Sequence, residues 1–182
     1  MRILIIFLFS ICSCASASNF IAWPDYSCST KDLNLVLSDL NFCTNPQTVK
    51  TIHFLGGEIP TLVLTDRNEN ILSLGKINAA KSIGNLHLKY KTNVLDFFKL
   101  LHKKDTSIKE LDSILRAFYI DANNQIYGFE GSGIYAFAIV GENKNTDTVY
   151  IIVPEADYVY QFIGEFSLEQ VKEFLASVKF DS

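Results

Sequence analysis

The most strongly patterned part of the chain lies between residues 127 and 178. Residues 134–140 (IYAFAIV) are apolar on both faces, which is typical of a strand covered on both sides of its sheet. One face of this strand carries the large side chains of Tyr135, Phe137 and Ile139. The other face carries Ala136 and Ala138, which are small enough to let a helix lie close. Residues 148–153 and 158–166 predict two further strands.

A helix is predicted directly after these strands. Ser167 and Gln170 form the Ser-x-x-Gln pattern of a capping box, in which each end of the motif satisfies a free backbone group of the other. The apolar positions that follow make a single helical stripe: Leu168, Val171, Phe174, Leu175 and Val178. We therefore expect a hairpin-like sheet with this helix folded back on it as the core.

The earlier part of the chain predicts a mixture of strands and helices. Short apolar strands are expected at residues 19–23, 48–55, 59–65 and 71–77. Helices are expected from Ser29 or Thr30 to Leu40, from Thr92 or Asn93, and after the capping box of Ser107 and Glu110. The pattern predicts an α/β or α+β fold, with helices packed on a mixed sheet.

The N-terminus has the features of a signal peptide. Arg2 precedes the short apolar run 3–11, and the small residues 15–17 (ASA) suit a signal peptidase. Cleavage after Ala17 is expected, and a bacterial lipoprotein box at Cys14 is the alternative. The run is too short for a stable membrane anchor. We therefore expect an exported protein, either secreted or in the lumen of the endoplasmic reticulum.

Removing residues 1–17 leaves 165 residues, enough for one domain over 18–182 or for two small lobes, 18–104 and 105–182. The net charge of −4 becomes −5 without Arg2. This acidic balance argues against nucleic acid as a partner.

Two of the four cysteines, Cys28 and Cys43, lie outside the predicted signal peptide. In an oxidising compartment they form a structural disulfide or remain as buried thiols. A helix over residues 30–40 would be about 15 Å long, whereas a disulfide needs its Cα atoms within about 7 Å. We expect the bond, which requires either that the chain doubles back at once or that the helix is shorter than predicted.

Three stretches carry a family resemblance. Residues 59–61 (IPT) look like a strand-opening cis-proline motif, residues 127–133 (YGFEGSG) like the approach to one, and 20–23 (FIAW) followed by Cys28 like a strand and active-site turn. Together they resemble the thioredoxin-like superfamily, in particular domains related to protein disulfide isomerase. Gly133 stands where that motif has proline, and Lys31 where the second cysteine would be. The resemblance implies a thioredoxin-like strand–hairpin–helix ending and a redox-inactive member.

No cofactor or metal site is expected. His53, His87 and His102 fall on different predicted elements without metal-ligand spacing, and His53 is expected in the core. The carboxylates Glu155, Asp157 and Glu165 frame a predicted strand, but solvated loop charges explain them better than a glycosidase pair.

Tyrosines and phenylalanines crowd residues 127–166, and such rings serve both packing and binding. The binding residues expected here are Tyr158, Tyr160 and Phe162, with Pro60. We therefore predict a non-catalytic, thioredoxin-like module that holds a protein or peptide partner. The alternatives are a thiol-dependent enzyme with a lone nucleophile, Cys28, and a secreted interaction or effector protein of unrelated α+β fold.

Overall fold

The computed structural model describes residues 19–104, 110–142 and 147–180. The predicted signal peptide and Ser107 lie outside these residues. No helix in the described part of the chain is long and apolar enough to cross a membrane.

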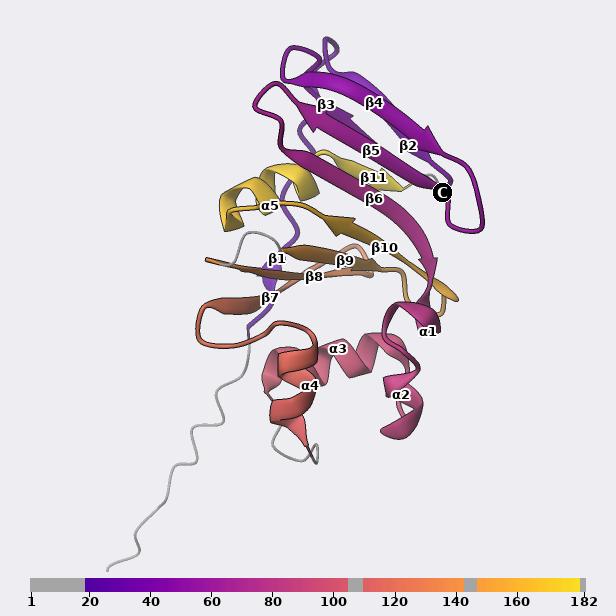
Figure 1. The fold of residues 1–182 in the computed structure, drawn as a ribbon, viewed down its shortest axis with the longest axis vertical. Coiled ribbons are helices and arrows are strands. Elements are labelled where there is room, and N and C mark those ends of the chain that lie inside the picture. Colours follow the sequence, from indigo (N-terminus) through magenta and orange to yellow (C-terminus); the bar gives the residue numbers. More distant parts are fainter. Residues whose placement is uncertain (1–18, 105–109, 143–146, 181–182) are drawn as a thin grey trace, which may run out of the picture.

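An eight-stranded sheet runs through the whole molecule (Figure 1). Its strands, in spatial order, are β1 (Ile21–Ala22), β7 (Asn124–Gly131), β8 (Ile134–Gly141), β9 (Thr148–Ile152), β10 (Tyr158–Ile163), β6 (Ile71–Asn78), β5 (Thr61–Asp66) and β4 (Val49–Leu55). The short β1 pairs with β7 in parallel, and the other neighbours are antiparallel. The sheet therefore ends in β4 on one side and in the two-residue β1 on the other.

A second, three-stranded sheet packs against one face of the first. It consists of β11 (Val178–Phe180), β3 (Leu40–Thr44) and β2 (Leu33–Leu37), in that order. Its buried residues Leu37, Leu40 and Phe42 belong to the same apolar cluster as Leu62 and Leu64 of β5. The two sheets therefore form a sandwich at this end of the molecule.

The helices lie on opposite sides of the large sheet (Figure 1). One side carries α1 (Ala79–Ser82), α2 (Leu86–Lys89), α3 (Val94–Lys103) and α4 (Leu111–Ala117), and the other carries α5 (Leu168–Ala176) beside the small sheet. The apolar cluster under α3 and α4 contains Phe97, Phe98 and Ile114 together with Phe137 and Ile139 of β8.

Strand β8 separates these two cores. Its alanines, Ala136 and Ala138, share a cluster with Val171 and Leu175 of α5, so the helix lies over the small face of the strand. Its large residues face the other core, where Phe137 stacks on Phe98 with ring centroids 5.3 Å apart. This confirms the strand expected at residues 134–140 and its two unlike faces.

The predicted fold class is wrong. The described residues form eleven strands and only five short helices, so the protein is mostly β and is not an α/β fold of the thioredoxin-like type. The strand–hairpin–helix ending exists locally, as β9, β10 and α5, but β10 also pairs with β6 and continues the sheet. In the described residues no peptide bond is cis, which includes the bond before Pro60.

The helix predicted from residue 29 or 30 to Leu40 is also wrong. Residues 33–44 form a hairpin in which Leu37 pairs with Leu40 across a two-residue turn, and Ser38 adopts a positive φ of 61°. Leu33, Leu35 and Leu37 alternate toward the core, and Asn34 and Val36 are exposed. The same leucines fit a helical stripe, so their spacing could not decide between the two.

Other local predictions are confirmed. The four early strands expected from the sequence are present as β1, β4, β5 and β6, within or close to residues 19–23, 48–55, 59–65 and 71–77. Asn93 caps α3 by accepting a hydrogen bond from the Asp96 backbone N–H. Ser167 and Gln170 make both hydrogen bonds of the predicted capping box, although Val178 lies in β11 beyond the helix.

Candidate functional site

The predicted binding residues on β10 face the core between the two sheets. Phe162 is fully buried and packs on Phe174 of α5 with ring centroids 4.0 Å apart. Tyr160 is fully buried and Tyr158 is half-buried. The fourth predicted residue, Pro60, is exposed in the loop between β4 and β5, so the structure does not bring it together with the other three.

The two tyrosine hydroxyls meet one carboxylate. Asp39, in the turn of the β2–β3 hairpin, accepts hydrogen bonds from Tyr158, at 2.5 Å, and from Tyr160. Lys76 of β6 donates to the same carboxylate at 2.8 Å and lies over the Tyr158 ring, 3.6 Å from its centroid. This Asp39 cluster fastens the small sheet to the large one.

The cluster changes the protonation of its members. Burial alone would raise the pKa of Asp39, but the hydrogen bonds from Lys76, Tyr158 and Tyr160 outweigh it and hold that pKa well below its usual range. The hydrogen bond to Asp39, together with burial, raises the pKa of Tyr158 to about 12. The Asp39 carboxylate is therefore already bound by Lys76 and both tyrosine hydroxyls. This favours a structural role for both tyrosines.

Cys28 and Cys43 form the expected disulfide, with their Cα atoms 6.0 Å apart. The bond is possible because the chain between them turns back as a hairpin instead of forming a helix. It joins the segment before β2 to the penultimate residue of β3. Cys28 therefore has no free thiol while the bond is intact.

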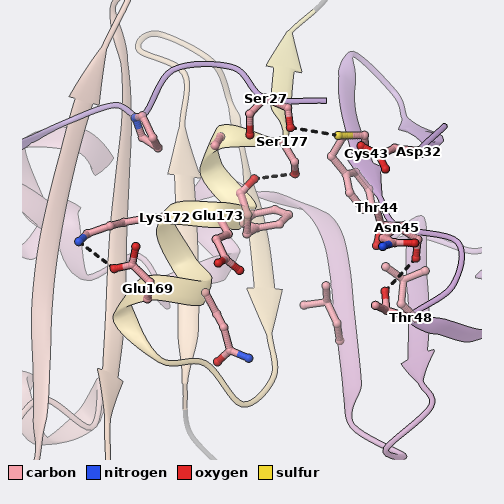
Figure 2. Close-up of a pocket in the computed structure, with 17 residues that line it drawn as sticks. Ser27, Asp32, Cys43, Thr44, Asn45, Thr48, Glu169, Lys172, Glu173 and Ser177 are labelled. Carbon is pink, nitrogen blue, oxygen red and sulfur yellow. Dashed lines mark hydrogen bonds and ion pairs between the residues drawn. The ribbon is translucent and has the colours of Figure 1, made fainter. Parts of the chain in front are cut away.

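A groove beside this disulfide is the candidate site (Figure 2). It lies between α5 and the connection from β3 to β4, and it consists of two adjoining hollows of about 670 and 220 Å³. We call it the α5 groove. The residues that line both hollows are Thr44, Thr48, Leu64, Leu72, Gln170 and Phe174.

The floor of the α5 groove is apolar. Leu64 of β5 and Leu72 of β6 are direct partners in the antiparallel register, so their side chains lie on the same face of the sheet. Phe174 of α5 packs against Phe42 of β3, with ring centroids 6.0 Å apart. Residues far apart in sequence thus build one apolar surface, which the fold positions through both sheets and the helix.

The rim of the α5 groove is acidic. Five carboxylates line the two hollows: Asp32, Asp66, Glu165, Glu169 and Glu173. The cation among the lining residues is Lys172, which pairs with Glu169 at 3.1 Å. In Figure 2 this pair lies on the side of α5 away from Thr44 and Asn45. The rim therefore has a net negative charge.

Two of these carboxylates also organise the loops that carry them. Asp32 accepts a hydrogen bond from the Ser29 backbone N–H at 2.7 Å. Asp66 accepts from the backbone N–H groups of Asn68 and Asn70 in the β5–β6 turn, at 2.7 and 2.9 Å. Burial opposes ionisation, but a hydrogen bond from the Asn70 side chain and these two backbone bonds together lower the pKa of Asp66. Their hydrogen bonds thus fix both carboxylates in place next to the groove.

The groove offers apolar surface, carboxylates and backbone polar groups, which suits binding. Its lining residues include no histidine, and its one cysteine is in the disulfide. The described residues contain no group of three His, Cys, Asp or Glu side chains placed to hold a metal ion.

Sequence reasoning missed most of the groove. Glu165, which lines the rim, is exposed, as expected for a solvated loop charge. Glu155 and Asp157 are exposed as well. The available signal was the spacing of Glu169 and Glu173, four residues apart on the polar side of α5. His53, expected in the core, is instead exposed on β4.

A comparison with models of known protein families finds no match for this chain, and neither does a comparison with curated proteins.

Proposed function

We propose that this chain is an exported, non-catalytic binding protein that holds a basic, apolar peptide segment of a partner protein in the α5 groove. The observation that supports it is the acidic rim above an apolar floor. In a peptide segment that alternates apolar and basic side chains, the apolar side chains can pack on Leu64, Leu72 and Phe174. The basic side chains then lie beside the carboxylates of the rim.

The charge of the whole molecule supports the same class of partner. Within the described residues, 79–104 and 110–119 carry seven Lys or Arg against three Asp or Glu, a net charge of +4. The other described residues, which build the sheets and α5, carry six Lys or Arg against fifteen Asp or Glu, a net charge of −9. The groove is thus on the acidic part of the protein, whose field attracts a basic segment.

Export is supported by two features. The Cys28–Cys43 disulfide is typical of an oxidising compartment, and the apolar run 3–11 followed by small residues is typical of a signal peptide. A secreted protein or one in the lumen of the endoplasmic reticulum would fit both. The alternative of thiol chemistry at Cys28 has no free thiol to act with while the disulfide is intact.

Fluorescence anisotropy with labelled synthetic peptides tests the proposal. The probe alternates leucine with lysine; one control replaces lysine with glutamate, and a second replaces leucine with serine. We expect saturable binding of the probe and at least about tenfold weaker binding of each control, equal to about 1.4 kcal/mol. Equal binding of the leucine–glutamate peptide would contradict the proposed charge preference.

Paired charge reversals locate the site. Glu173→Lys combined with Glu165→Lys should weaken binding of the leucine–lysine probe by about tenfold or more. The matched control, Glu142→Lys combined with Glu130→Lys, makes the same change of charge at exposed positions on β7 and after β8 that do not line the groove. Equal loss in both double variants would mean that net charge alone, and not the groove, binds the peptide.

A further inference from the structure

The last strand of the large sheet, β4, exposes an unusual amount of apolar surface. Ile52, Phe54 and Leu55 are 38%, 62% and 53% exposed. β4 is seven residues long and pairs only with β5 among the described strands. One side of its backbone is therefore available for a further strand.

From Thr51 to Leu55, β4 lacks the charges and prolines with which proteins usually block such an edge, and its register shift against β5 lies before this stretch, between Val49 and Thr51. Residues 51–57 contain no proline and no Lys, Arg, Asp or Glu. Lys50, at the start of the strand, forms an ion pair with Glu69 of its own chain. Since edge strands are normally protected by charges, prolines or short length, an edge of this composition indicates a pairing surface.

The exposed side chains continue the core of the sandwich. Ile52 and Phe54 lie opposite Leu64 and Leu62 of β5, so they are on the face that contributes to the core. A strand added beside β4 would cover Ile52 and Phe54 and extend that core outward.

We propose that β4 pairs with the β4 strand of a second copy of this chain, antiparallel and about a two-fold axis at His53. Directly opposite residues of an antiparallel pair lie on the same face of the sheet, whereas neighbouring residues along a strand point to opposite faces. A two-fold axis perpendicular to the sheet must therefore pass midway between one residue and the same residue of the second copy. With His53 at the axis, Ile52 lies opposite the second copy's Phe54, and Phe54 opposite its Ile52. In this register the apolar side chains of each strand therefore contact apolar side chains of the other strand.

The neighbouring registers fit less well. With Ile52 at the axis, Phe54 would lie opposite Lys50, and with Phe54 at the axis, Ile52 would lie opposite Gly56, so each of these registers leaves one apolar side chain without an apolar partner. In the His53 register Lys50 lies opposite Gly56, beyond the strand, where its side chain stays in water. The pattern of β4 therefore fits a second copy of the same strand, and the β4 residues that would pair, 50–56, do not line the α5 groove.

Multi-angle light scattering of the full chain tests the association. We expect twice the mass of one chain, and we expect Phe54→Lys to weaken dimerisation by at least about 100-fold, since each dimer contains two Phe54 rings. The matched control is Leu88→Lys on α2, where the leucine is 64% exposed. A monomeric wild type, or a dimer that both variants leave unchanged, would overturn the proposal.

Single cysteines test the register. Opposite residues have Cβ atoms about 4.5–5.5 Å apart, so His53→Cys should form a cross-link between chains on oxidation. Leu55→Cys is the control, because two copies of residue 55 would lie about 14 Å apart along the strands. Peptide mapping distinguishes these bonds from any at the native cysteines. Cross-linking through residue 55 and not through residue 53 would contradict the register.

Discussion

At the scale of single residues, Asp39 determines how the two sheets meet. Its carboxylate binds Tyr158 and Tyr160 of β10 and Lys76 of β6, while its backbone forms the turn of the β2–β3 hairpin. Hydrogen bonds to a charged group are stronger than neutral ones, and losing one leaves the remaining polar groups without a partner.

Asp39→Asn should lower the free energy of unfolding by roughly 1–2 kcal/mol. This estimate is below the full value for buried charged hydrogen bonds, because the side chain of Asp39 is 36% exposed. Urea denaturation measures the loss. The control is Asp25→Asn, which changes an exposed aspartate for which the structure gives no hydrogen bond. An equal, small effect of both substitutions would contradict the role of Asp39.

The same carboxylate predicts a pH dependence. The folded protein holds the pKa of Asp39 well below its usual range, so the folded state binds fewer protons than the unfolded chain in acid. The stabilisation is complete above the ordinary carboxyl pKa of about 3.9 and is lost as the pH falls below it. Unfolding free energies measured over an acid pH series should therefore converge for wild type and Asp39→Asn. A constant difference down to the lowest pH would contradict this linkage.

The aromatic residues of the Asp39 cluster could be predicted from the sequence, but their partner could not. The alternation of Tyr158, Tyr160 and Phe162 indicated one face of a strand, and it is the core face. Asp39 is 119 residues away from Tyr158, and nothing local marks it as different from other turn aspartates. Without that contact, the sequence left both packing and binding open for these tyrosines.

At the scale of elements, helices with local signals were predictable. In α5, the hydrogen bonds of the capping box connect residues three positions apart, so the pattern of Ser167 and Gln170 is sufficient to place the start. The β2–β3 hairpin had no such signal, because its leucines match both periodicities. Its turn begins at Ser38, which has a positive φ uncommon for serine.

Ser167→Ala should destabilise the protein by about 1 kcal/mol, the usual cost of losing a helix N-cap. The hydroxyl of Ser167 accepts a hydrogen bond from the Gln170 backbone N–H, and the alanine variant leaves that donor free. Ser167→Asn is the matched control, since asparagine caps equally well. Thermal denaturation compares the variants. If the alanine and asparagine variants were equally stable, the cap would not contribute to stability.

At the scale of the whole molecule, the sheet order was beyond the reach of sequence patterns. β1 pairs with β7, where Ile21 lies opposite Phe129, and β10 pairs with β6, where Val159 lies opposite Ile77. Such pairings depend on the packing of the complete chain. The α5 groove depends on the same packing, because its floor combines Leu64, Leu72 and Phe174 from three elements. The sequence therefore contains the groove residues, but it does not predict that they lie close together in space.

Removing the disulfide should cost about 3 kcal/mol of stability. The bond closes a loop between residues 15 positions apart, and constraining such a loop in the unfolded chain is worth about that much. Wild-type protein with and without reductant, and the double variant Cys28→Ala with Cys43→Ala, should show the loss in guanidinium denaturation. Reductant should not affect the double variant. No effect of reductant on the wild type would contradict the prediction.

The most direct test of the α5 groove is to map its occupant residue by residue. Amide chemical shifts of isotope-labelled protein should be recorded during titration with the leucine–lysine peptide. The largest changes should fall on both walls and the floor of the groove, at Thr44, Leu72 and Phe174, with little change in α1–α4. Changes concentrated on β4 or on the helices of the basic side, with the groove unaffected, would contradict the proposed binding site.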